Sequence, residues 1–177
     1  KVNGISAQAL FDPIICAPNS LEINDISRDT FATIISRTWI VNKDTSQEIT
    51  FNPFFSDAGL FDVFLAVVDS WGCTDTLLLP KSIESVKVDP GFRADSLGCT
   101  FTDIRYIPSG NNVNTSAYLW DFGDGSTSTD QVANHQYTVE DSFTVCLSLF
   151  DSRGCDNTIC KENYIDIKDP KASFIAD

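Results

Sequence analysis

The fold of this protein is decided by residues 143–160, which read FTVCLSLFDSRGCDNTIC. From Phe143 to Leu149 every second residue is apolar, and this period of two is typical of a β-strand with one face in a core. The turn residues 151–154, Asp-Ser-Arg-Gly, then reverse the chain into a second short run that ends at Cys160. The stretch therefore predicts a β-hairpin.

Part of this hairpin is present twice. Residues 69–76 read DSWGCTDT and residues 151–158 read DSRGCDNT, which indicates a period of about 82 residues. Nearly the same period separates Trp39 from Trp120. Because short alternating runs bounded by turn residues fill both copies, we predict an all-β chain of two tandem immunoglobulin-like antiparallel β-sandwiches.

The repeat also predicts the domain boundaries. Phe11, Phe92 and Phe174 follow one another at the same period, and an Asp-Pro pair precedes each of the last two. We expect four parts: residues 1–4 as the tail of a preceding repeat, 5–88 as the first sandwich, 89–169 as the second, and 170–177 as the start of a third. The array is expected to continue in both directions.

Composition excludes several classes of partner. The 177 residues carry 25 Asp and Glu against 12 Lys and Arg, a net charge of −13 that repels nucleic acid. No apolar run reaches the ~18 residues of a transmembrane helix, so no membrane insertion of this segment is expected. The six Cys form no C-x-x-C pair and only one His is present, which argues against zinc and for disulfides in an extracellular, oxidising compartment.

A family resemblance rests on the middle of the second repeat. Residues 118–126 read YLWDFGDGS, and they are followed by His-Gln-Tyr at 135–137 and Phe-Thr-Val at 143–145. This series resembles the signature of the polycystic-kidney-disease (PKD) domain. In the first repeat, WIVNKD at 39–44 and PFF at 53–55 replace the glycine-containing turn and the His-x-Tyr element. The first repeat is therefore identified as a degenerate member through the internal period.

The cysteines give a narrower resemblance. Cys16-Ala17-Pro18 and the Gly-Cys pairs are similar to the cysteine-bearing PKD repeats of very large Bacteroidota surface proteins, including gliding-motility adhesins exported by type IX secretion. This resemblance implies a structural or adhesive module of a cell-surface filament, with neighbouring repeats of the same chain as partners and with self-assembly.

Two other classes of function compete with this interpretation. An accessory polymer- or protein-binding module of a secreted hydrolase is the alternative, because PKD domains also accompany such enzymes. An enzyme in its own right is not expected, since no nucleophile with its base and no metal cluster can be assembled from the sequence.

The acidic turn of the second repeat has two interpretations. The glycines within residues 121–126 permit a tight turn with positive φ, in which Asp side chains accept hydrogen bonds from backbone N–H groups. The alternative is calcium coordination by Asp121, Asp124 or Asp130, although the spacing of an EF-hand is missing. No other cofactor is expected. His135, the one histidine, is interpreted as a packed structural residue.

Two of the cysteines lie on opposite strands of the predicted hairpin. Cys146 and Cys160 are seven residues either side of Arg153, so they face each other on a regular hairpin, and we expect a disulfide between them. Phe64 and Leu78 occupy the same positions of the first repeat, where they are expected to form an apolar cross-strand pair.

Four cysteines remain, and two schemes compete for them. One bridge within each repeat would join Cys16 to Cys73 and Cys99 to Cys155. In an immunoglobulin-like topology, however, these partners lie at opposite ends of a sandwich, roughly 17–20 Å apart, whereas bridged Cα atoms lie within about 7 Å. We therefore favour a bridge between the repeats, Cys16–Cys155, and expect Cys73 and Cys99 to bond neighbouring repeats.

The three tryptophans fall into two groups. Trp39 and Trp120 stand in strands at the position where sandwiches often bury a central Trp, so both are predicted to be core residues. Trp71 lies in a turn beside Gly72, where a large aromatic side chain is normally exposed. We predict that Trp71 packs on a neighbouring repeat.

Overall fold

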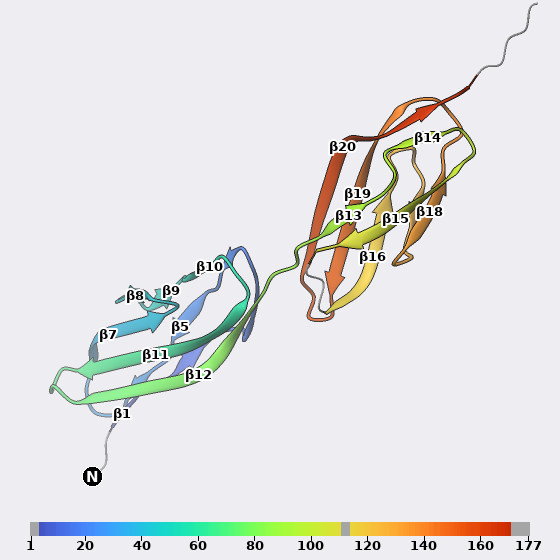
Figure 1. Ribbon diagram of the computed structural model, residues 1–177. Coiled ribbons are helices and arrows are strands. Elements are labelled where there is room, and N and C mark those ends of the chain that lie inside the picture. Colours follow the sequence, from blue (N-terminus) through green and yellow to red (C-terminus); the bar gives the residue numbers. More distant parts are fainter. Residues whose placement is uncertain (1–3, 111–113, 171–177) are drawn as a thin grey trace, which may run out of the picture. The chain divides into compact units, whose positions relative to one another are not determined.

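The computed structural model describes residues 4–110 and 114–170 (Figure 1). The chain divides into two compact units, Lys1–Lys87 (unit 1) and Val88–Asp177 (unit 2), and the division lies one residue from the expected boundary. Apart from Gly4 and Pro170, the expected tail of a preceding repeat and the expected start of a third repeat lie outside the described residues. Each unit is described by itself below.

Unit 1 is built from short strands and one long hairpin. Its five-stranded sheet has the order β3 (Ile14–Cys16), β12 (Thr74–Val86), β11 (Gly59–Asp69), β7 (Ile34–Val41) and β8 (Asp44–Ser46). Its three-stranded sheet has the order β2 (Ala9–Leu10), β5 (Ile23–Asp25) and β9 (Thr50–Phe51). Two small pairs complete it, β1 (Ile5–Ser6) with β6 (Arg28–Asp29) and β4 (Asn19–Ser20) with β10 (Phe54–Phe55).

Unit 2 repeats this plan with the same strand order. Its five-stranded sheet runs β14 (Leu97–Cys99), β20 (Asp156–Lys168), β19 (Ser142–Asp151), β16 (Thr115–Asp121) and β17 (Thr127–Ser128). Its three-stranded sheet runs β13 (Gly91–Arg93), β15 (Asp103–Ser109) and β18 (Ala133–Gln136). No described residue is helical, and no helix that could span a membrane is found among those residues.

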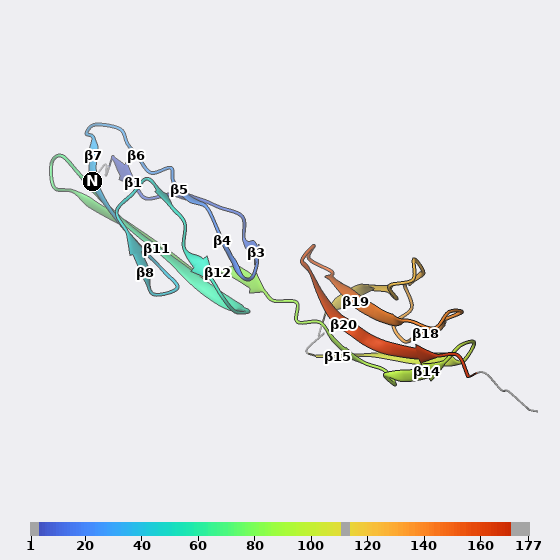
Figure 2. The same ribbon diagram turned by 90° about the horizontal axis from the view of Figure 1, so that it is seen from above.

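The two sheets of each unit enclose one hydrophobic core. In unit 1, Ile23 and Phe51 from the smaller sheet join Trp39 and Leu65 from the larger one in a single buried cluster. Figure 2 shows these two layers from above. The predicted class, all-β with two tandem antiparallel sandwiches, is confirmed.

The same core position is filled by tryptophan in both units, as predicted. Trp39 pairs with Leu65 and Trp120 pairs with Leu147 in the strand registers, and both indoles are fully buried. Each indole Nε1 donates a hydrogen bond to a backbone carbonyl, Trp39 to Glu48 at 3.0 Å and Trp120 to Asp130 at 2.9 Å. A buried indole N–H needs such an acceptor, and in both units a backbone carbonyl provides it.

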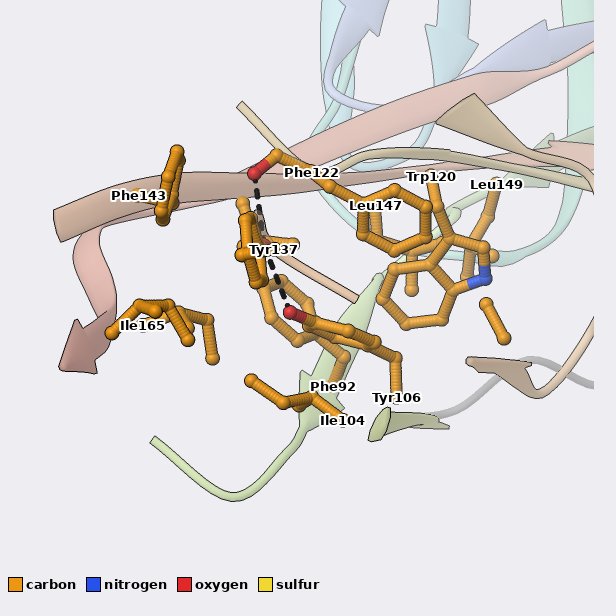
Figure 3. Packing of buried hydrophobic residues seen from close by; sticks show 13 residues of the cluster. Phe92, Ile104, Tyr106, Trp120, Phe122, Tyr137, Phe143, Leu147, Leu149 and Ile165 are labelled. Atoms are coloured by element: carbon orange, nitrogen blue, oxygen red, sulfur yellow. Dashed lines mark hydrogen bonds between the residues drawn. The ribbon is translucent and has the colours of Figure 1, made fainter. Parts of the chain in front are cut away.

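Polar groups also connect the aromatic core of unit 2. The Tyr137 hydroxyl donates to the carbonyl oxygen of Phe122 at 3.0 Å, and its oxygen lies 2.9 Å from the hydroxyl of buried Tyr106 (Figure 3). Since the single proton of Tyr137 is directed at Phe122, Tyr106 is the donor to Tyr137. The ring of Tyr137 also stacks on Phe143 with centroids 4.1 Å apart. This chain of contacts ties β15 and β19 to the residue after β18 and to the turn after β16.

Candidate functional site

The turn between the two longest strands has the same construction in both units. Asp69 ends β11, and its Oδ1 accepts hydrogen bonds from the amides of Trp71 at 2.8 Å and Cys73 at 2.9 Å. Gly72 has a φ of 81°, a left-handed conformation that a side chain disfavours. The turn is thereby held in one conformation and presents Cys73 at its base.

Asp151 plays the same part in unit 2. Its Oδ1 accepts the amide of Arg153 at 2.7 Å, and its own amide donates to the carbonyl of Cys155 at 2.7 Å. The Arg153 guanidinium bonds the same carboxylate, with Nε 2.9 Å from Oδ1, and holds the pKa of Asp151 below its ordinary value. Cys155 therefore occupies the position of Cys73, with Arg153 in the place of Trp71.

These two turns lie beside the start of their own units. In unit 1 the amide of Ala7 donates to Asp75 Oδ2 at 2.8 Å, two residues beyond Cys73. In unit 2 the side-chain amide of Asn157, two residues beyond Cys155, donates to the carbonyl of Val88 at 2.8 Å. Each unit thus has one cysteine next to the residues with which it begins.

A second cysteine lies beside the end of each unit. Strand β3 pairs in parallel with the last strand of unit 1, with Cys16 opposite Val86, and the amide of Ala17 donates to Val86 at 2.7 Å. Strand β14 pairs in the same way with β20, and Cys99 lies opposite Lys168. The cysteine beside the start of each unit is therefore separated from the one beside its end by the whole length of the last strand.

This separation decides against a bridge within either unit. Strands β12 and β20 each contain 13 residues, which at about 3.3 Å per residue span about 40 Å. Bridged Cα atoms lie within about 7 Å of each other. The expected 17–20 Å was too short, because it assumed strands of average length. Cys16–Cys73 and Cys99–Cys155 are both excluded on this geometry.

The four cysteines differ in their state. Cys73 and Cys99 are exposed free thiols, whereas Cys16 and Cys155 carry no free thiol. Loss of solvent around its sulfur, followed by the charge of the Asp69 carboxylate, raises the pKa of the Cys73 thiol above its ordinary value. A thiol with a raised pKa is mostly protonated at neutral pH and reacts slowly with small oxidants.

The hairpin disulfide is present as expected. Cys146 and Cys160 are register partners on β19 and β20, with Sγ atoms 2.03 Å and Cα atoms 4.1 Å apart. In unit 1 the same register pairs Phe64 with Leu78, so the expected apolar pair is also found. One structural position is thus filled by two kinds of cross-strand pair.

The three candidate calcium ligands accept hydrogen bonds from nearby residues. Asp121 Oδ1 accepts the amide of Gly123 and Asp124 Oδ1 accepts the amide of Ser126, each at 2.9 Å. Asp130 lies near the hydroxyl of Ser128, 3.3 Å from its Oδ2. No group of three Asp, Glu, His or Cys side chains that could hold a metal ion occurs among the residues that the structure describes. The hydrogen bonds of Asp121 and Asp124 agree with the turn interpretation, and calcium coordination stays a prediction.

His135 is part of the support of that turn. Its ring stacks on Phe122 with centroids 4.2 Å apart, and its Nε2 lies 2.8 Å from Asp124 Oδ2. Burial alone would raise the pKa of Asp124, but the Ser126 amide and His135 lower it below its ordinary value. The interpretation of His135 as a packed structural residue agrees with these contacts.

Trp71 is 69% exposed in the turn that carries Cys73. Because this turn precedes β12 and the chain leaves unit 1 after β12, Trp71 is a full strand length from the connection to unit 2. A repeat that covered Trp71 would have to lie at the opposite end of unit 1. The predicted contact stays a prediction.

One surface was missed by the sequence reasoning. Ile40, Leu60 and Leu78 are about half exposed on the outer face of the five-stranded sheet of unit 1, beside Phe64. The corresponding face of unit 2 has the Cys146–Cys160 disulfide. The signal was present, because these side chains stand at the outward positions of alternating strands.

Comparisons with known proteins agree with the geometry of unit 2. Residues 102–167 match the family model of the PKD domain, which confirms the resemblance for this part of the chain. A microbial collagenase of Vibrio alginolyticus is 49% identical over 51 residues, 29% of this chain and 6% of that protein. Collagenase ColA of Bacillus cereus is 38% identical over 63 residues, 35% of this chain and 6% of that protein.

Among solved structures, the PKD1 domain of the Vibrio cholerae metalloprotease PrtV is similar to part of the chain. It is 26% identical, with a TM-score of 0.39, and the similarity covers 45% of this chain and 93% of that domain. The chain thus spans only a small fraction of the curated relatives that it matches.

Proposed function

We propose that the chain is a non-catalytic, extracellular module of a longer secreted protein, in which a Cys16–Cys155 disulfide stiffens the junction of the two sandwiches. Such a module holds other parts of the protein at a set distance and orientation, as a cell-surface filament or adhesin requires. The observation that carries this proposal is that each unit has one cysteine beside its start and one beside its end.

The short connection supports the bridge. Cys16 pairs with Val86, Cys155 lies two residues from Asn157, and Asn157 bonds Val88. Val86 and Val88 are separated by at most about 7 Å of chain. The two cysteines therefore flank the same connection, where tethering gives them a high effective concentration for each other.

The remaining features suit export. A cross-strand disulfide such as Cys146–Cys160 forms and persists in oxidising compartments. A net charge of −13 favours the solubility of a protein that is displayed outside the cell. We further propose that the longer protein is a large, repetitive surface protein exported by type IX secretion, as the resemblance of the cysteine pattern implies.

The bridge can be tested on the intact chain. Non-reducing peptide mapping should join the Cys16 peptide to the Cys155 peptide. Small-angle scattering should then show a broader range of conformations for the Cys16→Ser, Cys155→Ser double variant than for the parent chain. The matched control is Cys73→Ser with Cys99→Ser, which should scatter like the parent. A Cys16 peptide joined to any other cysteine, or unchanged scattering on loss of the bridge, would overturn the proposal.

A second candidate is an accessory substrate-binding module of a secreted hydrolase. The matches to two collagenases favour it. An exposed aromatic row on one sheet would have supported it, but the exposed aromatic residues of described unit 2 are Phe101, in a turn, and Phe150, on β19. Co-sedimentation of the chain with insoluble collagen decides: saturable binding supports this candidate, and recovery of all protein in the supernatant rejects it.

A further inference from the structure

The two free thiols occupy the same positions as the two cysteines of the proposed bridge. Cys73 lies in the β11–β12 turn at the start of unit 1, as Cys155 lies in the β19–β20 turn at the start of unit 2. Cys99 lies opposite the last residue of β20, as Cys16 lies opposite the last residue of β12. We call Cys73 and Cys155 start cysteines and Cys16 and Cys99 end cysteines. One of each kind, Cys73 and Cys99, is exposed and has a free thiol.

A second observation indicates what these positions do. The equivalent residues Cys16 and Cys155 carry no free thiol in this same chain. One cysteine beside the start of a unit and one beside the end of a unit are thus disulfide-bonded in this chain, whereas the other cysteine of each kind has a free thiol.

We propose that Cys99 of one copy forms a disulfide with Cys73 of the next copy when the two follow each other head to tail. The partner is a second copy of this chain, or a repeat that carries the same start cysteine. This inference rests on the proposed junction and extends it from one bridge to a series, in which every unit is covalently joined to both of its neighbours twice, through the backbone and through sulfur.

The chemistry needs a two-electron oxidant, for which oxidised glutathione serves. One thiolate attacks the glutathione disulfide, and one glutathione thiolate leaves. The second cysteine thiolate then attacks the resulting mixed disulfide and releases the second glutathione. Two protons and two electrons leave the cysteine pair, and one glutathione disulfide becomes two thiols. The raised pKa of Cys73 slows its own attack on glutathione disulfide.

Trp71 adds a contact surface to the same turn. It stands two residues before Cys73 and is 69% exposed, whereas Arg153 at the equivalent position of unit 2 is bound by Asp151. A neighbour joined at Cys73 would cover part of this indole. Burial of an exposed Trp on a partner is a common source of contact energy.

The test joins two complete copies in the register of the natural connection. Residue 168 of the first copy is followed directly by residue 5 of the second, so that Lys168-Ile5 takes the place of Val86-Lys87. The protein is purified with its existing disulfides intact and with Cys73 and Cys99 of both copies reduced, and it is then treated with oxidised glutathione. Peptide mapping should join Cys99 of the first copy to Cys73 of the second, and the content of free thiols should fall from four to two per molecule.

The controls separate this inference from the junction on which it rests. Cys73→Ser in the second copy should abolish the new bridge, whereas Cys73→Ser in the first copy should leave it intact. If Cys16–Cys155 forms but Cys99 and Cys73 remain reduced or capped by glutathione, this inference is overturned and the proposed function stands. If Cys16–Cys155 is also missing, both fail.

Discussion

The hydroxyl oxygens of Tyr106 and Tyr137 lie 2.9 Å apart inside unit 2, and only Tyr137 also reaches a backbone carbonyl. The two hydroxyls are therefore unequal. Loss of the Tyr137 hydroxyl leaves both the Tyr106 O–H and the Phe122 carbonyl without this partner, whereas loss of the Tyr106 hydroxyl keeps the bond to Phe122.

We predict that Tyr137→Phe lowers the free energy of unfolding of unit 2 by about 2–4 kcal/mol, and Tyr106→Phe by about 1 kcal/mol, since unsatisfied buried polar groups cost more than a lost bond. Hydrogen exchange followed by mass spectrometry measures the stability of each unit separately within the full chain. Equal effects of the two variants would contradict the assigned direction of the bond.

Alkaline pH should destabilise unit 2 selectively. Burial raises the pKa of Tyr137 to about 12, and it also raises the pKa of Tyr106. A raised pKa in the folded state means that the contribution to stability is complete below the unfolded value of about 10 and is lost as the pH rises through the folded value. All four tyrosines belong to unit 2.

Hydrogen exchange between pH 9 and 11, corrected for the intrinsic rate, should show accelerated opening of unit 2 with little change in unit 1. Tyr137→Phe provides the control, because it removes one of the two titrating groups and should flatten the pH dependence. A parallel loss in both units would point to general charge repulsion instead.

Gly123 should be much less tolerant than Gly125. Both have positive φ, 81° and 92°, but a Cβ on Gly123 would collide with the backbone oxygen of Thr144, whereas nothing lies within 4 Å of one on Gly125. We expect Gly125→Ala to cost about 1 kcal/mol from backbone strain alone. Gly123→Ala should cost at least twice as much, because β19 must also shift.

Urea denaturation of the two variants measures the difference, and Gly125→Ala is the matched control for strain. If the two variants unfold at the same urea concentration, the close approach of the turn to Thr144 is not maintained in solution.

The hairpin disulfide should stabilise unit 2 by about 3 kcal/mol, since it closes a loop with a sequence separation of 14 residues. Cys146→Ala with Cys160→Ala removes it without leaving a free thiol. Hydrogen exchange should show the loss in unit 2 only, because unit 1 has Phe64 and Leu78 at these positions. A loss below 1 kcal/mol would mean that cross-strand packing, and not the covalent link, holds the hairpin.

Acid should weaken unit 1 through Asp25. Its Oδ2 lies 2.8 Å from Arg37 Nε, and its side chain is only 4% exposed. Burial alone would raise the pKa of Asp25, but hydrogen bonds from Ser27 and Arg37 lower it below the ordinary value of 3.8. The contribution to stability is therefore present above about pH 4 and is lost as the pH falls through the lower folded value.

Asp25→Asn should reduce the stability of unit 1 at pH 7 by about 1–3 kcal/mol and should weaken its dependence on pH between 2 and 4. Thermal unfolding across this range gives the comparison. An unchanged acid transition in the variant would assign the acid sensitivity to other carboxylates.

Local features of the chain were predictable because their determinants are close together in sequence. The alternation from Phe143 to Leu149, the turn at Asp151 and the facing cysteines of the hairpin follow from the geometry of two adjacent strands. The internal period alone predicted that Phe64 and Leu78 pair in unit 1 at the positions that Cys146 and Cys160 occupy in unit 2.

Long-range features were not predictable in this way. Both long strands contain a bulge, at Lys81 and Asn163, where φ is 50° and 48°. Asp62 and Thr144 accept the amides at these bulges from the neighbouring strands. Nothing in the local sequence specifies that partner, because the pairing is set by the register of whole strands.

The repeated all-β organisation, the buried tryptophans and the disulfide-closed hairpin all follow from the order of the amino acids, since periodicity and turn chemistry are local properties. The position of Cys16 and Cys99 beside the last residues of their units is visible only in the folded protein. That placement depends on the parallel pairing of β3 with β12 and of β14 with β20, contacts between segments about 70 residues apart. Only the folded protein also shows that the acidic turn holds its carboxylates on backbone amides, because those hydrogen bonds depend on the exact path of the folded turn.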